Sequence, residues 1–188
     1  MLPVRYRSEA GVALISVTQV LSLAGRIEDR WFTPESARRG QIVHDLTEVF
    51  DRGDELDVPY DLMGYMEAYA NFVATVRPVY SASEVRVVNP TLGVAGRIDR
   101  VCSDLWGSPG IVDFKTGAPM PWHGGQLAFY NFLKPTGARW GCYLQANGRF
   151  KLKQYDDPLD HAQNMHDLAK ARGTVYANGD YWINRTKR

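Results

Sequence analysis

Hydrophobic residues recur with a helical period in the first part of the chain. Ser16 is a typical capping residue, and Gly25 is a typical helix stop nine residues later. Thr33 followed by Pro34 predicts the start of a second, longer helix that ends at Gly53. The expected helices cover about residues 16–24, 34–53 and 61–76. In the second helix the expected core stripe consists of Ile42, Leu46, Val49 and Phe50.

The period then changes from 3.6 to 2, which indicates strands near residues 83–88, 94–102 and 110–115. A helix is expected over residues 122–133. Two strands near 140–145 and 150–155 follow, joined at Asn147-Gly148, a strong hairpin signal. Asp157-Pro158 opens a last helix that runs to about residue 176. This order predicts one α/β domain over residues 1–188, with a central mixed sheet flanked by helices and an N-terminal helical segment.

Composition excludes several classes of protein. No apolar run reaches the roughly 20 residues that span a bilayer, and Arg5 and Arg7 interrupt any signal peptide, so a cytoplasmic protein without a membrane partner is expected. The net charge is +1, so binding to nucleic acid would need a local groove. Cys102 and Cys142 are too few for a four-cysteine iron–sulfur or zinc site, and we expect two reduced thiols.

Acidic residues concentrate on a predicted hairpin centred on Trp106. In that register Asp99 lies opposite Asp113, and two carboxylates so close need a proton, a cation or solvent. Lys115 lies on the same face as Asp113, because side chains alternate along a strand. Two carboxylates and an ammonium on one face suit a hard divalent cation. A surface hairpin with a salt bridge between Lys115 and one aspartate is the alternative.

The neighbours of this face carry two further expectations. Ile98, Val112 and Phe114 are expected in the core on the opposite face of the hairpin. Arg97 falls beside Lys115 in this register, so a phosphate or Glu84 is needed to neutralise the two cations.

His44 lies roughly 160–200° from the apolar stripe of its helix, at 100° per residue, so it is not expected to pack in the core. Gly40 lies one turn earlier on the same face, although glycine inside a helix costs about 1 kcal/mol relative to alanine. Bare backbone beside a histidine would let a ligand or another strand approach closely. A solvated histidine beside an accidental glycine is the alternative.

A second pair of polar residues shares a helix face further along the chain. Gln126 and Tyr130 are spaced i, i+4, and Gly124-Gly125 precede them near the helix start, where free N–H groups favour an anion. On a mostly apolar helix such a pair more often packs and hydrogen-bonds within the fold. Trp31, Phe32 and Trp122 could stack on bases or belong to the core, and His123, His161 and His166 have no spacing that joins them to His44.

Four motifs in this order resemble the RecB-type branch of the PD-(D/E)XK nuclease superfamily. The family pattern is G-x-x-x-H on a helix, then G-x-x-D, D/E-x-K and Q-x-x-x-Y. In this chain the motifs are Gly40 to His44, Gly96 to Asp99, Asp113 to Lys115 and Gln126 to Tyr130. Each motif alone is weak, but four in the right order over about half the chain are specific.

The resemblance implies a deoxyribonuclease that uses Mg²⁺ or Mn²⁺ and needs no iron–sulfur cluster, because the four cysteines of some relatives are missing here. It assigns His44, Asp99, Asp113 and the backbone carbonyl of Phe114 as metal ligands. Lys115, with Asp99 and Asp113, would be catalytic. Glu84 is a candidate for a second ion or for a role through water. Gln126 and Tyr130 would line the groove and contact DNA.

By the same resemblance we expect an exonuclease acting on single-stranded or duplex DNA ends, in phage or bacterial recombination or repair. Recombination or single-strand-binding proteins are then conceivable partners. The metal motifs do not themselves separate exonuclease from endonuclease. The main alternative is a nuclease-fold protein that binds DNA without cutting it, although a binding module needs no paired carboxylates. The basic end of the chain, with Arg185, Lys187 and Arg188, would add phosphate contacts or be a solvated tail.

Overall fold

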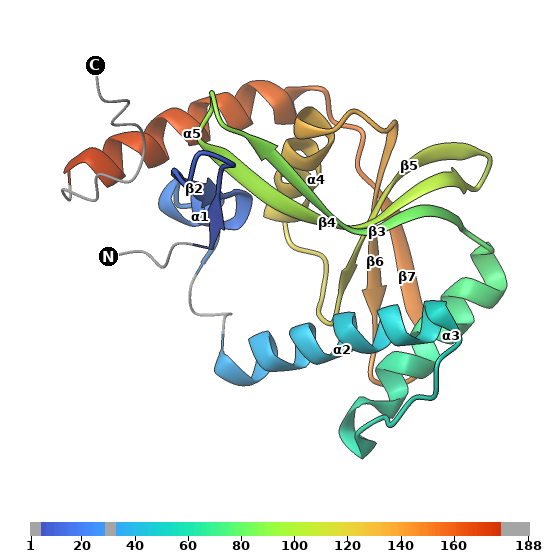
Figure 1. Cartoon of the computed structure of the whole chain (residues 1–188). Coiled ribbons are helices and arrows are strands. Elements are labelled where there is room, and N and C mark those ends of the chain that lie inside the picture. The colour runs from blue at the N-terminus through green and yellow to red at the C-terminus, as the bar shows by residue number, and fades with distance from the viewer. Residues whose placement is uncertain (1–4, 29–32, 178–188) are drawn as a thin grey trace.

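A mixed sheet of seven strands runs through the computed structural model, which describes residues 5–28 and 33–177 (Figure 1). The strand order is β1-β2-β4-β5-β6-β7, and β3 pairs with β4. Helices cover both faces of the sheet, as predicted. The strands are β1 (Tyr6–Arg7), β2 (Ala13–Ser16), β3 (Val79–Asn89), β4 (Val94–Leu105), β5 (Ser108–Lys115), β6 (Ala138–Leu144) and β7 (Phe150–Gln154). The helices are α1 (Val17–Leu23), α2 (Pro34–Arg52), α3 (Met63–Val76), α4 (Trp122–Leu133) and α5 (Leu159–Ala177), with a 3₁₀ turn at Tyr60–Leu62 before α3.

Local signals set the ends of the first two helices. The Ser16 hydroxyl accepts a hydrogen bond from the backbone N–H of Gln19, and Thr33 does the same for Ser36. Gly53 ends α2 in the left-handed conformation, with φ of 72°, which glycine adopts without steric cost. The predicted capping residues are therefore confirmed.

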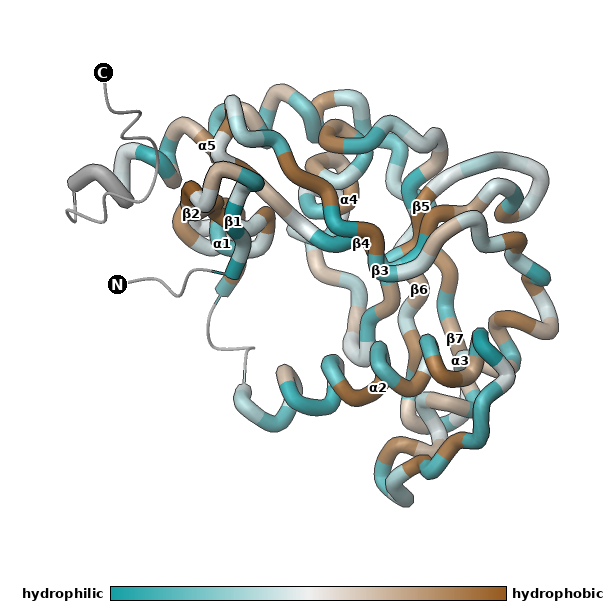
Figure 2. The backbone as a smooth tube through the Cα atoms, in the orientation of Figure 1, coloured by the Kyte–Doolittle hydropathy of each residue, from teal (hydrophilic) through white to brown (hydrophobic). Residues whose placement is uncertain are grey.

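The buried side of α2 differs from the prediction. Val43 and Thr47 are fully buried, whereas Ile42, Leu46 and Phe50 are only partly buried at the edge of the core. Figure 2 shows hydrophilic and hydrophobic positions alternating along this helix. Val43 and Thr47 face the sheet, and on the surface of the helix they lie between the apolar stripe and His44. His44 therefore also points toward the sheet.

β4 organises the sheet because three strands pair with it. β3 runs antiparallel along one edge, from Val79–Asp104 to Asn89–Val94. A strand has two edges, so β2 and β5 share the other one: β2 pairs with Val94 and Ala95, and β5 pairs from Arg100 onward. Residues 96–99 of β4 fall between these two ladders. The gap contains the glycine and the aspartate of the G-x-x-D motif.

The sheet separates two hydrophobic clusters. One is built around α1, α4 and α5 and includes Ile98, whereas the other lies under α2 and α3 and includes Val112 and Phe114. All three residues are buried, as predicted, but they do not share one face. Cys102 and Cys142 are buried free thiols in the second cluster, consistent with the expected reduced pair.

The predicted N-terminal helices are present, but two short strands that precede them were not predicted. The hairpin of β1 and β2 precedes α1, and β2 pairs in parallel with β4. All four residues of β2 are buried, so the segment lacks the alternation that indicates a strand. The other predicted elements are confirmed within a few residues at each end. In the described part of the chain, no helix is long and apolar enough to cross a membrane.

Candidate active site

The two predicted carboxylates lie at the end of the β4–β5 ladder. Cys102 pairs with Gly110 and Arg100 with Val112, so the same register carries Asp99 to the position opposite Asp113. There the Asp99 side chain takes the place of a backbone acceptor, and its Oδ2 receives a hydrogen bond of 2.7 Å from the Phe114 N–H. Both carboxylates are buried.

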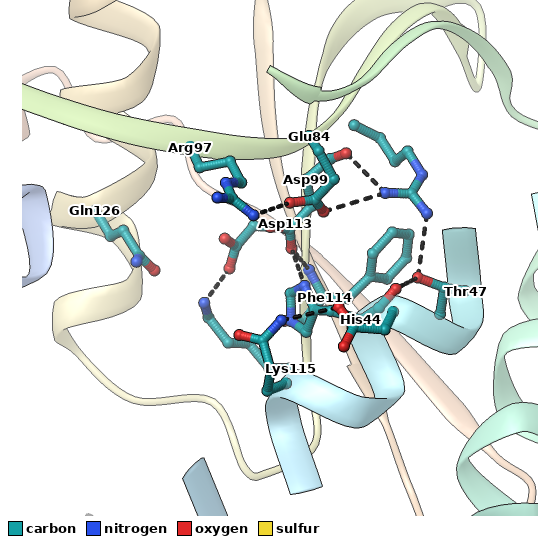
Figure 3. A network of polar contacts seen from close by, with 12 residues as sticks. His44, Thr47, Glu84, Arg97, Asp99, Asp113, Phe114, Lys115 and Gln126 are labelled. Atoms are coloured by element: carbon teal, nitrogen blue, oxygen red, sulfur yellow. Dashed lines mark hydrogen bonds and ion pairs between the residues drawn. The ribbon is translucent and has the colours of Figure 1, made fainter. Parts of the chain in front are cut away.

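His44 reaches this point from α2 (Figure 3). Its Nε2 donates to the backbone carbonyl of Phe114 at 3.0 Å, and its Nδ1 lies 3.4 Å from Oδ2 of Asp99. Burial of the imidazole lowers its pKa, but the attraction of Asp99 and their hydrogen bond outweigh burial and raise the pKa of His44 to about 9. The same pairing, with the Phe114 N–H, overcomes burial and lowers the pKa of Asp99. His44 is therefore held by two residues of the sheet, Asp99 on β4 and Phe114 on β5.

Asp113 forms an ion pair with Lys115, two residues along β5. Burial, reinforced by the repulsion of Asp99, outweighs this pairing and raises the pKa of the Asp113 carboxyl to about 6. The predicted grouping of two carboxylates and an ammonium is therefore present. It is a buried cluster and not the exposed salt-bridged hairpin of the alternative.

Glu84 completes the cluster from β3, where it adopts the left-handed conformation with φ of 49°, uncommon for a non-glycine residue. Its Oε2 accepts from Arg97 at 3.3 Å, so Glu84 neutralises Arg97, one of the two partners predicted for it. Its other oxygen, Oε1, is buried without a hydrogen bond and lies 3.5 Å from Arg100. Burial and the repulsion of Asp99 raise the pKa of Glu84.

These residues form a donor set that fits a divalent cation. Among the described residues, His44, Glu84 and Asp99 each offer one ligand atom, and the three atoms lie within 4.8 Å of one another. One nitrogen and carboxylate oxygens suit Mn²⁺ and are compatible with Mg²⁺. The buried Oε1 of Glu84 is a lone-pair donor that no N–H satisfies. We call His44, Glu84, Asp99, Asp113 and Lys115 the carboxylate site.

The composition of this set differs from the predicted one. Glu84 groups with His44 and Asp99, whereas the Asp113 carboxylate is turned to Lys115. The Phe114 carbonyl, the fourth predicted ligand, accepts the His44 hydrogen bond. The assignment of Asp113 and Phe114 as metal ligands therefore stays a prediction.

Gln126 and Tyr130 are buried on α4 and contact each other. Gln126 Nε2 donates to the Tyr130 hydroxyl at 3.2 Å and lies 3.4 Å from Thr18 Oγ1, and Figure 3 shows its amide beside the site. The Tyr130 ring packs on Gly96, where an added Cβ would lie 2.5 Å from Cε1 of the tyrosine. The glycine of one motif thus accommodates the tyrosine of another. Contact of these two side chains with DNA stays a prediction.

The remaining candidates that lie within the described residues contribute no ligand to the carboxylate site. Gly124 and Gly125 are buried, and a Cβ on Gly124 would lie 2.9 Å from Tyr155, so these glycines serve close packing and not an open anion site. His123 is buried and contacts the Tyr143 hydroxyl at 2.9 Å. Trp122 belongs to the first hydrophobic cluster, His161 lies against Phe132, and His166 is exposed. Trp31, Phe32, Arg185, Lys187 and Arg188 lie outside the described residues.

A second buried polar network adjoins the site and was not predicted. Arg100 is fully buried on β4; its Nε donates to Asp51 at 2.8 Å and its Nη2 to Thr47 at 3.1 Å. Asp51 also accepts a 2.6 Å hydrogen bond from Tyr69, whose hydroxyl contacts Tyr80. We call these five residues the arginine network. His44, Thr47 and Asp51 are spaced i, i+3, i+7, so their common helix face was the available sequence signal.

The family comparison agrees with this geometry. Residues 58–174, more than half of the chain, match the family model described as the PD-(D/E)XK nuclease superfamily. The chain belongs to this superfamily. The matched region contains Glu84, Asp99, Asp113 and Lys115, and His44 lies before it. Among curated proteins no sequence matches the chain.

Solved structures with the same fold match most of the length of this chain. A putative exonuclease from Eubacterium rectale is 14% identical with a TM-score of 0.59, over 98% of this chain and 88% of its own. The alkaline exonuclease of Laribacter hongkongensis is 12% identical with a TM-score of 0.53, over 89% and 90% of the two chains. The same exonuclease in complex with dAMP is 13% identical with a TM-score of 0.52, again over 89% and 90%. At these identities the likeness concerns the fold.

Proposed function

We propose that this protein is a Mg²⁺- or Mn²⁺-dependent deoxyribonuclease that hydrolyses phosphodiester bonds at DNA ends. The observation that carries the proposal is the cluster of buried Asp99 and Asp113 with the partly buried Glu84, in which Lys115 contacts Asp113 directly. Three ligand atoms of His44, Glu84 and Asp99 lie within 4.8 Å of one another, and Oε1 of Glu84 has no hydrogen bond, which a bound cation would satisfy. The fold shared with an alkaline exonuclease and with a protein described as a putative exonuclease supports activity at strand ends.

His44, Glu84 and Asp99 would hold the cation, with release of the proton that His44 carries toward Asp99, and Asp113 is the further candidate from β5. When bound, such a cation neutralises phosphate oxygens and makes water a nucleophile near neutral pH. The chain's own residues do the rest. The Phe114 N–H and His44 fix the orientation of Asp99, because both contact its Oδ2.

Lys115 has two roles in this proposal. Its ammonium stabilises the negative charge that develops on the phosphate, in a buried setting where such an interaction is strong. The ammonium also orients the attacking water, and its positive charge favours loss of the water's proton to the paired Asp113 carboxylate or to solvent. Its ion pair with Asp113 holds the ammonium at the end of β5, on the side of the carboxylates.

The deciding experiment is degradation of end-labelled linear DNA, single- and double-stranded, against a closed circle, with Mg²⁺, Mn²⁺ or EDTA. We expect metal-dependent loss of the linear forms only. Lys115→Ala should abolish cleavage while metal and DNA binding are retained, because the ammonium acts on the reacting phosphate. Lys153→Ala, which removes an exposed lysine of β7, is the matched control and should cleave like the wild type.

The other outcomes separate the alternatives. Cutting of the circle would make the protein an endonuclease with the same site. DNA binding without cleavage of any form would favour the silent DNA-binding module. A Lys115→Ala variant with wild-type turnover would contradict the assignment of the site. A place in DNA recombination or repair follows only from exonuclease activity, and loss of recombination in a strain that lacks the gene would test it.

A further inference from the structure

Two cavities share lining residues on α2. One has a volume of about 560 Å³ and the other about 370 Å³. Gly40 and His44 line both of them, and Asp99 lines the second. His44 and Lys115 of the carboxylate site line the first cavity, and His44, Glu84 and Asp99 line the second. Both volumes fall within or close to the roughly 300–1,000 Å³ of pockets that take small ligands.

The two cavities differ in chemistry. The larger one is mostly apolar and has Lys115 at its edge; its apolar walls come from Phe114, Ala118, Met120 and Trp122. The smaller one is polar, with the basic side chains of Arg5 and Arg97 around Glu84 and Asp99. An apolar wall suits the flat face of a base, and guanidinium groups suit phosphate oxygens. A nucleotide chain carries both kinds of group, because each sugar bears a base and successive sugars are joined by a phosphate.

Gly40 is not required by the packing of the protein. A Cβ built on this residue would meet one atom within 4 Å, Oγ1 of Thr116, at an ordinary contact distance of 3.9 Å. The glycines that the fold does need look different: a Cβ would lie 2.5 Å from Tyr130 at Gly96 and 1.8 Å from the Ala146 carbonyl at Gly64. Gly40 thus carries the helix cost of glycine without a packing reason.

We propose that the DNA strand crosses α2 over the bare backbone of Gly40. The base on one side of the scissile phosphate lies in the apolar cavity, and the next phosphate on the other side lies near Arg5 and Arg97. Glycine leaves room for the sugar–phosphate chain to pass beside His44. This assignment rests on the proposed nuclease function, since it places the substrate of that same site.

The test is Gly40→Ala, with Gly173→Ala as the matched control. Gly173 is also inside a helix, α5, and a Cβ there would meet nothing within 4 Å. Both variants should raise Tm by about 2–4 °C, because alanine favours the helix. Only Gly40→Ala should lose activity on single-stranded DNA, by about 10- to 100-fold in kcat/KM, because a blocked path misplaces the phosphate. Gly40→Leu should lose more.

Two further measurements distinguish a distorted carboxylate site from a blocked DNA path. Hydrolysis of bis(p-nitrophenyl) phosphate, which is too small to span both cavities, and Mn²⁺ affinity by calorimetry should stay within about twofold of the wild type for Gly40→Ala. Gly40→Ala with wild-type DNA cleavage would overturn the inference. Parallel loss of the small diester or of Mn²⁺ affinity would overturn it too, since the glycine would then act through His44. A wild-type protein that cleaves neither substrate refutes the proposed function itself.

Discussion

The arginine network and the carboxylate site are neighbours under α2, and both bury charge, yet they are built differently. Each of the three nitrogens of Arg100 donates a hydrogen bond: Nε to Asp51, Nη1 to the Asp99 carbonyl and Nη2 to Thr47. In the carboxylate site Oε1 of Glu84 has no hydrogen bond, and two cavities open onto His44. The comparison teaches that saturated buried charge holds a fold, whereas unsaturated buried charge beside a cavity is available for chemistry.

The largest expected effect is in the carboxylate site. Asp99→Asn should lower DNA cleavage by about 10³-fold or more, because the metal site loses an anionic ligand worth several kcal/mol in the transition state. The free energy of unfolding should fall by about 1–3 kcal/mol, because the amide oxygen still accepts from the Phe114 N–H but the ion pair with His44 is lost. Single-turnover cleavage and urea unfolding measure the two quantities.

Asp45→Asn is the control for this variant. It removes an exposed carboxylate from the same helix as His44 and should change neither quantity. If Asp99→Asn lowered stability by several kcal/mol and activity only in proportion, the carboxylate site would be as structural as its neighbour.

The converse is expected in the arginine network. Arg100→Met should cost about 3–5 kcal/mol of unfolding free energy, because Asp51 keeps its charge and loses its buried partner. Arg52→Met breaks the exposed pair with Asp54 on the same helix end and should cost about 0–1 kcal/mol. Equal midpoints for the two variants in urea would show that burial adds nothing to the Arg100 pair.

The smallest effect separates the two regions most cleanly. Tyr69→Phe removes the hydroxyl that donates to Asp51 at 2.6 Å and should cost about 1.5–3 kcal/mol, the range for a hydrogen bond to a charged group. DNA cleavage by the folded variant should equal that of the wild type. Tyr60→Phe, at an exposed tyrosine, is the control for stability. A cleavage rate that fell with Tyr69→Phe would join the two networks functionally.

The sequence predicts the parts of this site that depend on local spacing. Asp99, Asp113 and Lys115 follow from strand alternation around one turn, and His44 follows from its angle on a helix. Glu84 was only a candidate, because its left-handed backbone conformation, which aims the side chain at Asp99, has no glycine or turn signal to mark it. The family resemblance supplied the roles that spacing alone could not.

Local spacing in the sequence does not predict which distant segments pair. β1 has two residues and β2 has four buried ones, which is too short for a period to appear. The parallel pairing of β2 with β4, and the side of the sheet that takes Ile98, are set by packing against α1 and α4. Arg100 looked like one more charged residue of a strand until the sheet brought it against Asp51, 49 positions earlier.

The hydrogen bond from the Phe114 amide to Asp99 has a spectroscopic consequence. Most amide N–H groups of a central strand donate to a backbone carbonyl of a neighbouring strand. Their exchange with solvent deuterium follows the opening of the sheet. The Phe114 proton is held by a side chain at the end of a ladder. Its chemical shift and exchange rate therefore follow the state of one carboxylate, which makes this single amide resonance a built-in probe of the site.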